Sequence, residues 1–272
     1  GNSMVENIEP VLICIILRPE LAPAFVITKR AADMVFALIN EINGATLPSF
    51  AHLYAEGDNK KTRLALSHIM SLCFGLGVVG FGTYVAANQA FVRLWVGSDQ
   101  FLGMGFTLLV AVGLLMRVIM QFLSRFTIGA GDIVHASLLV LAEAGVRMIL
   151  MVGLLLGFGR EGLPLGMLIS CSIFGWIYYK RLERKLSLAF YHDWKCAQPV
   201  FLLLLTFSVC FVTAQQVFLL ETWGGWFAYS LVVLCVLLML NCTINPRLRE
   251  LFLTLPISLI RKHVIRRDVA DR

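Results

Sequence analysis

The chain has 272 residues, which would suffice for one large soluble domain or two small ones. Its composition excludes a soluble protein, because 58% of the residues are hydrophobic and only 15% are charged, against about 25% charged in soluble proteins. The mean hydropathy of +0.80 is typical of a chain that is largely surrounded by lipid. The net charge of +6 does not indicate a nucleic-acid partner, because the basic residues lie between apolar runs, as they do in membrane proteins.

The hydropathy pattern predicts an all-α fold, a polytopic transmembrane bundle of about eight helices. The first apolar run covers residues 4–17, which is shorter than the roughly 20 residues that span a bilayer. We therefore expect the chain to begin inside a transmembrane helix and to be a C-terminal part of a longer protein. The other expected helices are Glu20–Gly44, Leu64–Ala87, Phe101–Leu123, Ile133–Phe158, Leu163–Tyr179, Pro199–Leu220 and Trp223–Cys242.

Basic residues are concentrated on one side of the predicted membrane. Sixteen of the 23 basic residues fall in the loops of that side and in the tail, whereas the opposite loops hold Arg18, Arg93 and Arg160. An excess of positive charge marks the cytoplasmic side, so we expect a cytoplasmic C-terminus. Four basic residues remain inside the predicted helices, namely Lys29, Arg30, Arg117 and Arg147.

Four stretches of the first 180 residues resemble, in the right order, motifs of the polysaccharide (O-antigen type) flippases and the lipid II flippases. The stretch ATLPSFAHLYAEGD at 45–58 is similar to the loop that follows the eighth helix of those proteins. One departure is Arg18, where the family usually has Gly. The other three stretches are RPELAPAF at 18–25, LWVG at 94–97 and GREGLPLGMLIS at 159–170.

The resemblance implies a member of the multidrug/oligosaccharidyl-lipid/polysaccharide exporter superfamily. Such proteins consist of two six-helix bundles that face each other across a central cavity and open alternately to the two sides of the membrane. This chain would hold the second, C-terminal half of a transporter with 12–14 helices. Its expected parts are the six-helix bundle at 1–180 with a clipped first helix, a basic cytoplasmic linker at 181–197, an additional helix pair at 198–243 and a basic interfacial tail at 244–272.

The implied function is to flip a lipid-linked oligosaccharide, a polyprenyl-diphosphate glycan, between the two leaflets of a bacterial inner membrane. The glycan would move from the cytoplasmic to the outer leaflet, for the biosynthesis of a cell-surface polysaccharide such as lipopolysaccharide. The implied partners are this substrate, membrane lipids, the missing N-terminal bundle of the same protein and a glycan polymerase or assembly complex. Sodium or protons would be the coupling ions.

The second expected helix carries an unusual number of charges for a span, and each costs about 2.5–3.5 kcal/mol on insertion scales. At 100° per residue, Arg30, Asp33 and Glu41 share one polar face with Asn40, and Lys29 lies one turn from Asp33. These charges either neutralise one another inside the bundle or line a hydrated cavity. The resemblance supports the cavity, because an arginine of the eighth helix of lipid II flippases projects toward the diphosphate headgroup. Arg30 matches that arginine, and Asp33 matches an acidic position one turn on.

Charges occur in three further helices. Glu143 and Arg147 are spaced i,i+4, so they either neutralise each other or face the cavity. Arg117 has no partner within a turn, so it either meets an acid of another helix or adds a charge to the cavity. Glu6 and Glu9 lie on the first helix. Because some flippases of the superfamily couple to sodium through acids of the seventh and eleventh helices, Glu6 or Glu9 together with Glu143 are the candidates for binding the coupling ion.

Two other functions stay open. A cation-coupled multidrug exporter would share the fold, but drug cations favour an acidic cavity, and four basic residues lie within the helices here. A membrane enzyme of glycan polymerisation would need catalytic residues in long extracytoplasmic loops, and the loops expected outside are short. The sequence holds no G-x-S-x-G, H-E-x-x-H or glycine-rich phosphate motif, so we expect neither an enzyme nor a metal site.

Overall fold

The computed structural model describes residues 2–186, 206–207, 209–210, 222–244 and 249, and these residues form helices and no strand. This confirms the expected all-α bundle. The helix expected at 199–220, the basic linker and the basic tail lie largely outside the described residues, so the number of about eight helices stays a prediction. The described helices are α1 (Asn2–Ile16), α2 (Leu21–Ala55), α3 (Asn59–Val96), α4 (Met104–Gly129), α5 (Ile133–Phe158), α6 (Gly162–Leu186) and α8 (Trp223–Ile244), with 3₁₀ turns η1 (Ser98–Gln100) and η2 (Gly159–Glu161).

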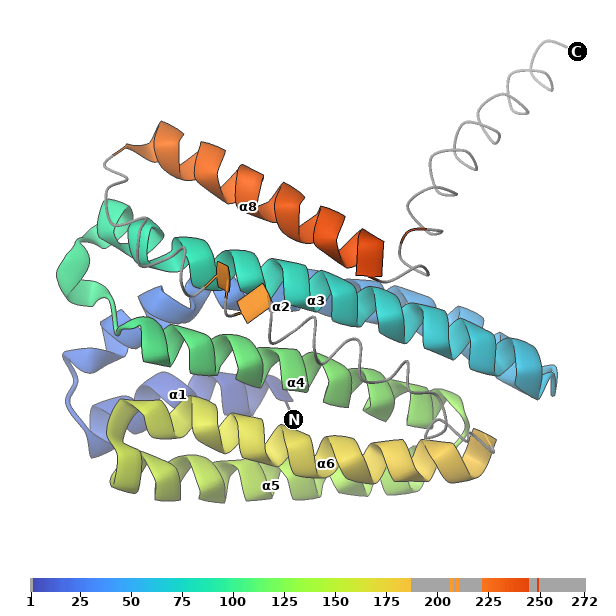
Figure 1. Cartoon of the computed structure of the whole chain (residues 1–272). Helices are drawn as coiled ribbons and strands as arrows, with labels where there is room; N and C mark the ends of the chain where they lie inside the picture. The colour runs from blue at the N-terminus through green and yellow to red at the C-terminus, as the bar shows by residue number, and fades with distance from the viewer. Residues whose placement is uncertain (1, 187–205, 208, 211–221, 245–248, 250–272) are drawn as a thin grey trace, which may run out of the picture.

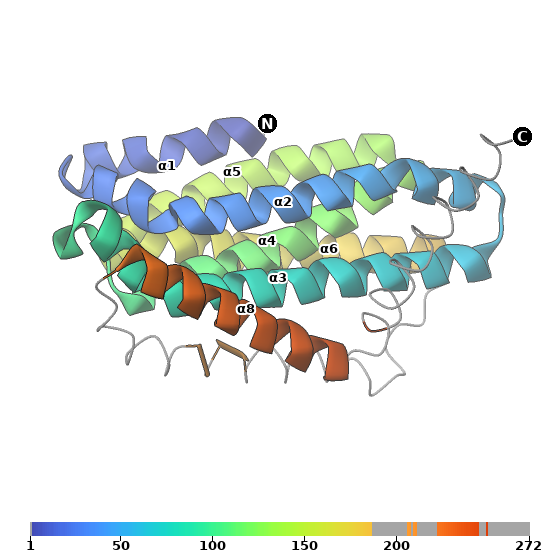
Figure 2. The ribbon, with the colours of Figure 1, turned by 90° about the horizontal axis from the view of Figure 1, so that it is seen from above.

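The helices lie side by side, and the chain reverses direction at each turn (Figures 1 and 2). One end of the bundle holds the α2–α3 and α4–α5 turns and the C-terminal end of α6. The other end holds the α1–α2 turn, η1 and η2. We name the first end the basic end, because eight basic residues of the described chain lie in its helix termini, against three at the opposite end. These eight are Lys60, Lys61, Arg63, Arg125, Lys180, Arg181, Arg184 and Lys185.

Four segments of the described chain are long and apolar enough to cross a membrane, judged by length and composition, so the chain is a membrane protein. They are Lys60–Val96, Met104–Gly129, Ile133–Lys185 and Trp223–Thr243, of which the third includes both α5 and α6. Helix α2 is not among them, although its 35 residues would extend about 52 Å. Its charged side chains and the polar side chains of its second half, such as Asn40 and Asn43, explain the difference.

The turn between α2 and α3 is shorter than the sequence predicts. The stretch 45–58, expected as a loop, is helical as far as Ala55, and Pro48 lies within that helix. The chain then turns at Gly57, which has a φ of 76°, and Asp58 caps α3. The Oδ1 atom of Asp58 accepts hydrogen bonds from the backbone N–H groups of Lys60 (3.1 Å) and Lys61 (3.0 Å). The Gly-Asp pair therefore ends one helix and begins the next.

Three other helices also extend beyond their predicted ends. Helix α3 begins five residues earlier than predicted and continues to Val96, and α4 continues to Gly129, so Arg125 lies in a helix and not in a loop. Helix α6 continues to Leu186 and includes Arg181, Arg184 and Lys185, which are expected in the linker. The sequence predicts loops at these polar residues because hydropathy falls where a helix leaves the lipid. The backbone hydrogen bonds of the helix nevertheless continue into the headgroup region.

Helix α4 lies at the centre of the bundle and packs against α2, α3 and α6. Aromatic rings fill the core near the basic end, where the ring centroids of Phe50 and Phe126 are 4.4 Å apart. Glycines bring α5 and α6 together at the opposite end. A Cβ on Gly166 would lie 2.8 Å from the backbone nitrogen of Met151, closer than real Cβ atoms approach. The stretch 159–170 therefore contains glycines that permit close helix packing.

Helix α8 packs on the outside of α3 (Figure 1). Two polar side chains join it to the α3 backbone near its two ends. The indole Nε1 of Trp226 donates to the carbonyl oxygen of Ala87 (3.1 Å), and Nδ2 of Asn241 donates to that of Gly75 (3.2 Å). Within the described chain, helix α8 thus adds to the outside of the bundle on α3 and does not pack against α2.

Candidate functional site

One side of α2 is exposed along most of the helix. Val26, Arg30, Met34, Leu38 and Glu41 are all exposed and form a stripe, because the helix turns 100° per residue. We name this stripe the open face of α2. Arg30 lies nine residues, or about 14 Å, into the helix, so two charged residues occupy a surface beside membrane-spanning helices. Contact of such charges with lipid is costly, so this face must meet water or another protein.

Lys29 lies at the edge of the open face and joins α2 to α1. Its Nζ atom lies 2.5 Å from Oε2 of Glu9 and 3.4 Å from Oδ1 of Asp33. The side chains of Lys29 and Glu9 are 7% and 5% exposed, whereas that of Asp33 is 44% exposed. A buried base is therefore shared between a buried acid of α1 and an accessible acid of α2.

The residue next to Lys29 fixes this part of α2. Thr28 is fully buried, and its carbonyl oxygen accepts hydrogen bonds from the hydroxyl of Tyr84 (2.9 Å) and Nδ2 of Asn88 (3.0 Å), both on α3. Its hydroxyl donates to the carbonyl oxygen of Gln100 (3.2 Å) and accepts from the N–H of Leu102 (3.3 Å). The backbone that carries Lys29 and Arg30 is thus attached to α3 and to the segment before α4.

Two arginines of the predicted site are buried inside the bundle. Arg117 of α4 is 1% exposed, and its guanidinium carbon lies 4.8 Å from the centroid of the Phe36 ring, a cation–π contact with α2. Arg147 and Glu143 of α5 have side chains that are 1% and 2% exposed. The Nε atom of Arg147 lies 3.3 Å from Oε1 of Glu143, an ion pair without the geometry of a hydrogen bond.

These charged side chains belong to neighbouring helices of one bundle: Lys29 is paired with Glu9 and Asp33, Arg147 with Glu143, and Arg117 contacts Phe36 of α2. We name the group the charge cluster. Its three acids and three bases come from four helices, and their charges cancel when all six are ionised. The members are Glu9 of α1, Lys29 and Asp33 of α2, Arg117 of α4, and Glu143 and Arg147 of α5.

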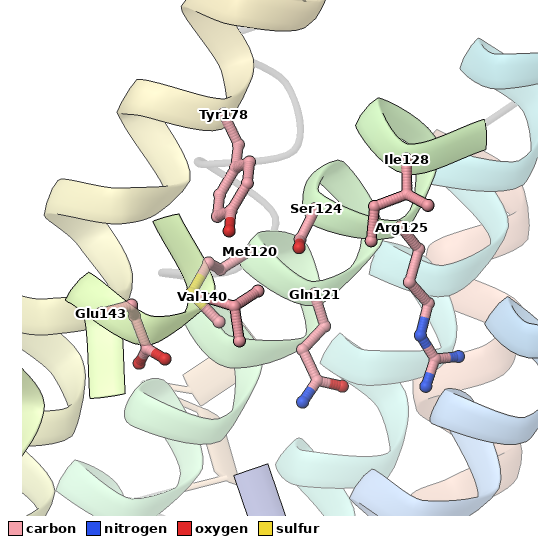
Figure 3. Close-up of a pocket in the computed structure, with 8 residues that line it drawn as sticks. All are labelled: Met120, Gln121, Ser124, Arg125, Ile128, Val140, Glu143 and Tyr178. Carbon is pink, nitrogen blue, oxygen red and sulfur yellow. The ribbon is translucent and has the colours of Figure 1, made fainter. Parts of the chain in front are cut away.

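A pocket of about 170 Å³ reaches the charge cluster from the side of the basic end (Figure 3). Figure 3 shows Glu143 of α5 and Tyr178 of α6 on one side, and Gln121, Ser124 and Arg125 of α4 on the other. Gln121 is 8% exposed, and its Oε1 atom has no hydrogen-bond partner among the described residues. A pocket of this size and polarity suits several water molecules. The other lining residues are Met120, Ile128 and Val140.

The turns at the basic end carry their own ion pairs. Asp132 precedes α5 and its carboxylate accepts a hydrogen bond from Nε of Arg181 in α6. Its Oδ1 atom also lies 2.9 Å from Nδ1 of His135. The hydrogen bond from Arg181 is the main cause that lowers the pKa of Asp132 below its usual value. At the α2–α3 turn, the hydrogen bonds from Lys61 lower the pKa of Asp58 in the same way.

The structure brings most of the predicted site residues together, but in two places. Arg30 and Glu41 are exposed on the open face. Asp33 connects this face to the buried charge cluster, which holds Lys29, Arg117, Arg147, Glu9 and Glu143. The side chain of Glu6 lies outside the described residues. Within the described chain, no group of three or more His, Cys, Asp or Glu residues could hold a metal ion.

Sequence reasoning missed two features. It paired Lys29 with Asp33 and not with Glu9, because the i,i+4 spacing is visible in a sequence and a contact between helices is not. It also missed the pocket. Gln121 and Ser124 are polar residues of α4 spaced i,i+3, and this spacing is the signal that would have indicated a shared polar face.

Comparison with known proteins finds no family model, no curated protein and no solved structure that matches this chain.

Proposed function

We propose that this protein is the C-terminal half of a flippase for lipid-linked oligosaccharide, a member of the multidrug/oligosaccharidyl-lipid/polysaccharide exporter superfamily. The observation that carries the proposal is the open face of α2. Arg30 and Glu41 are exposed on a helix that packs against α3 and α4, both long and apolar enough to span a membrane. A hydrated cavity between this face and an opposing bundle would give these charges a polar environment.

Arg30 suits a diphosphate headgroup for three physical reasons. A guanidinium stays charged at any depth, its planar fork matches two phosphate oxygens, and it is more weakly hydrated than an ammonium. A diphosphate must carry negative charge across an apolar layer, and a fixed cation beside its path lowers that barrier. Residues 28 and 29 are fixed by α1, α3 and the segment before α4, so the neighbouring Arg30 is presented on an ordered backbone.

We also propose a topology and partners for this chain. The basic end faces the cytoplasm of a bacterial cell, the chain lies in the inner membrane and its C-terminus is cytoplasmic. The opposing bundle is the N-terminal half of the same protein, and a glycan polymerase or assembly complex receives the product. Transport is by alternating access and uses sodium or protons. The cell-surface product is a polysaccharide such as lipopolysaccharide. The chain itself has no enzymatic activity in this proposal.

The test is Arg30→Ala in the full-length protein, expressed in a strain that lacks its flippase. We expect loss of surface glycan at unchanged protein abundance, and partial recovery with Arg30→Lys, which keeps the charge and loses the fork. Arg160→Ala is the matched control, because Arg160 is an exposed arginine of η2 at the end of the bundle. Wild-type surface glycan from Arg30→Ala would contradict the proposal.

A further inference from the structure

We propose that Asp33 is a proton-binding site, and that its protonation gives the neutral charge cluster one net positive charge beside the open face, where it strengthens the binding of an anionic headgroup. The first part concerns this chain alone. The second part rests on the proposed function, because it names the class of ligand that the positive charge serves.

Because Lys29 is shared by two acids, Asp33 is the acid whose negative charge the cluster can lose at the lower cost. Lys29 is 0.9 Å closer to Glu9 than to Asp33, the distances being 2.5 and 3.4 Å. Protonation of Asp33 would leave the closer and more deeply buried pair intact. Protonation of Glu9 would remove the nearer, buried partner of a lysine that is 7% exposed and leave only the partner at 3.4 Å, which is the more costly change.

Asp33 is also the acid that solvent can reach. Its side chain is 44% exposed, whereas those of Glu9 and Glu143 are 5% and 2% exposed. At 100° per residue, its Cα–Cβ direction lies between those of Lys29 and Arg30. A proton from water on the open face can therefore bind one carboxylate oxygen of Asp33, and this step involves proton uptake alone.

The charged and titratable groups around Asp33 come from each helix that packs on this part of α2. Helix α1 contributes Glu9, α4 contributes Arg117 and α3 contributes Tyr84, whose hydroxyl already donates to the carbonyl oxygen of Thr28. Helix α2 itself contributes Lys29 and the exposed Arg30. Two carboxylates that share one ammonium repel each other, and a proton on the accessible one relieves that repulsion. The 3₁₀ turn η1 approaches through the carbonyl oxygen of Gln100, which is not titratable.

Protonation of Asp33 changes the net charge of the charge cluster. With all six groups ionised the cluster is neutral, and with Asp33 protonated it has a net charge of +1. Arg30 adds a second positive charge on the open face. An anion at this face is therefore bound more strongly after proton uptake, and the binding of proton and anion is positively linked. Neutral Asn at position 33 would reproduce the protonated state at every pH.

The first experiment measures protonation without any ligand. Infrared spectra of the full-length protein in lipid nanodiscs are recorded between about pH 8 and pH 5.5, a range in which exposed carboxyl groups stay ionised. We expect a protonated-carboxyl band that grows as the pH falls, that is lost in Asp33→Asn and that remains in Asp33→Glu. Glu161→Gln, in an exposed position of η2, is the control and should keep the band. A band that persists unchanged in Asp33→Asn would overturn the inference.

The second experiment measures anion binding with farnesyl diphosphate as a short prenyl-diphosphate probe. For the wild type we expect affinity to rise by about tenfold as the pH falls across the transition, a typical coupling between linked sites. Asp33→Asn should bind tightly at both ends of the range, and any remaining pH response reports the titration of the probe. Glu161→Gln, at an exposed position of η2 away from the open face, should respond like the wild type. An equal pH response in wild type and Asp33→Asn would overturn the linkage.

The two experiments separate the two proposals. If the infrared band depends on Asp33 but the wild type binds no prenyl diphosphate at any pH, the proton site stands and the proposed substrate class fails. If the probe binds through Arg30 but no band depends on Asp33, the substrate class stands and the proton site fails.

Discussion

Lys29 of α2 and Glu9 of α1 form a buried ion pair, in which a distance of 2.5 Å separates the lysine Nζ atom from the glutamate Oε2 atom. This pair is a polar contact between the short helix α1 and the rest of the bundle. Removing one partner of a buried pair leaves an uncompensated charge, whereas removing both does not. This asymmetry gives the first prediction.

Lys29→Met should destabilise the protein by about 3–5 kcal/mol, and the double change of Lys29→Met with Glu9→Gln should recover most of that loss. Thermal unfolding in nanodiscs measures both effects. The control is Lys61→Met, because Lys61 is 70% exposed and lies 3.2 Å from Asp58, and such surface pairs contribute less than about 1 kcal/mol. Equal losses from Lys29→Met and Lys61→Met would show that the buried pair does not hold α1.

Gly166→Ala should destabilise the bundle by about 1–3 kcal/mol, because the added Cβ would lie 2.8 Å from the backbone nitrogen of Met151 and must push α5 and α6 apart. Gly153→Ala is the matched control in α5. Nothing lies within 4 Å of its Cβ position, so the change should be neutral or stabilise the helix by about 0.5–1 kcal/mol. Thermal unfolding in nanodiscs measures both changes. A stabilising effect of Gly166→Ala would contradict the close packing of α5 and α6.

The carboxylate of Asp132 should make the turn at the basic end sensitive to acid. Its pKa is lowered in the folded protein by the hydrogen bond from Arg181, so it contributes stability above its unfolded pKa of about 3.9. That contribution is lost as the pH falls through the lower, folded pKa. Arg181→Leu should therefore lower the melting temperature at neutral pH, and this difference should shrink as the pH falls below about 3.9. A difference between the two proteins that does not shrink with acid would exclude this linkage.

Ser124→Cys, in a background without other cysteines, should react with a small water-soluble thiol reagent, because Ser124 lines the pocket between α4, α5 and α6. Thr127→Cys lies one turn further along α4 at a fully buried position outside that pocket and should stay unreactive. Mass spectrometry after timed labelling gives both rates. Equal labelling of the two cysteines would show that the pocket is closed to water.

The fold class could be predicted from the sequence because apolar runs of about 20 residues have few alternatives to a helix in lipid. The α5 helix has the bounds that hydropathy predicts, Ile133–Phe158, because a turn with Gly131 precedes it and another with Gly159 follows it. The C-terminal ends of α2, α3, α4 and α6 were predicted too early. Each of these helices continues beyond the segment that hydropathy marks as apolar, because hydropathy reports the lipid boundary and not the end of the backbone hydrogen bonds.

The sequence by itself determined which residues carry charge inside the apolar segments, and it determined the contacts within one helix. Lys29 with Asp33 and Glu143 with Arg147 follow from the i,i+4 spacing, which fixes neighbours on a helix whatever surrounds it. Only the tertiary structure decided which of these charges are buried and which are open. It placed Glu9 against Lys29 across 20 residues, buried Arg117 against Phe36 and left Arg30 exposed. The rotation of each helix about its axis and the choice of its neighbours depend on how all the helices pack together, and no spacing within a single helix contains that information.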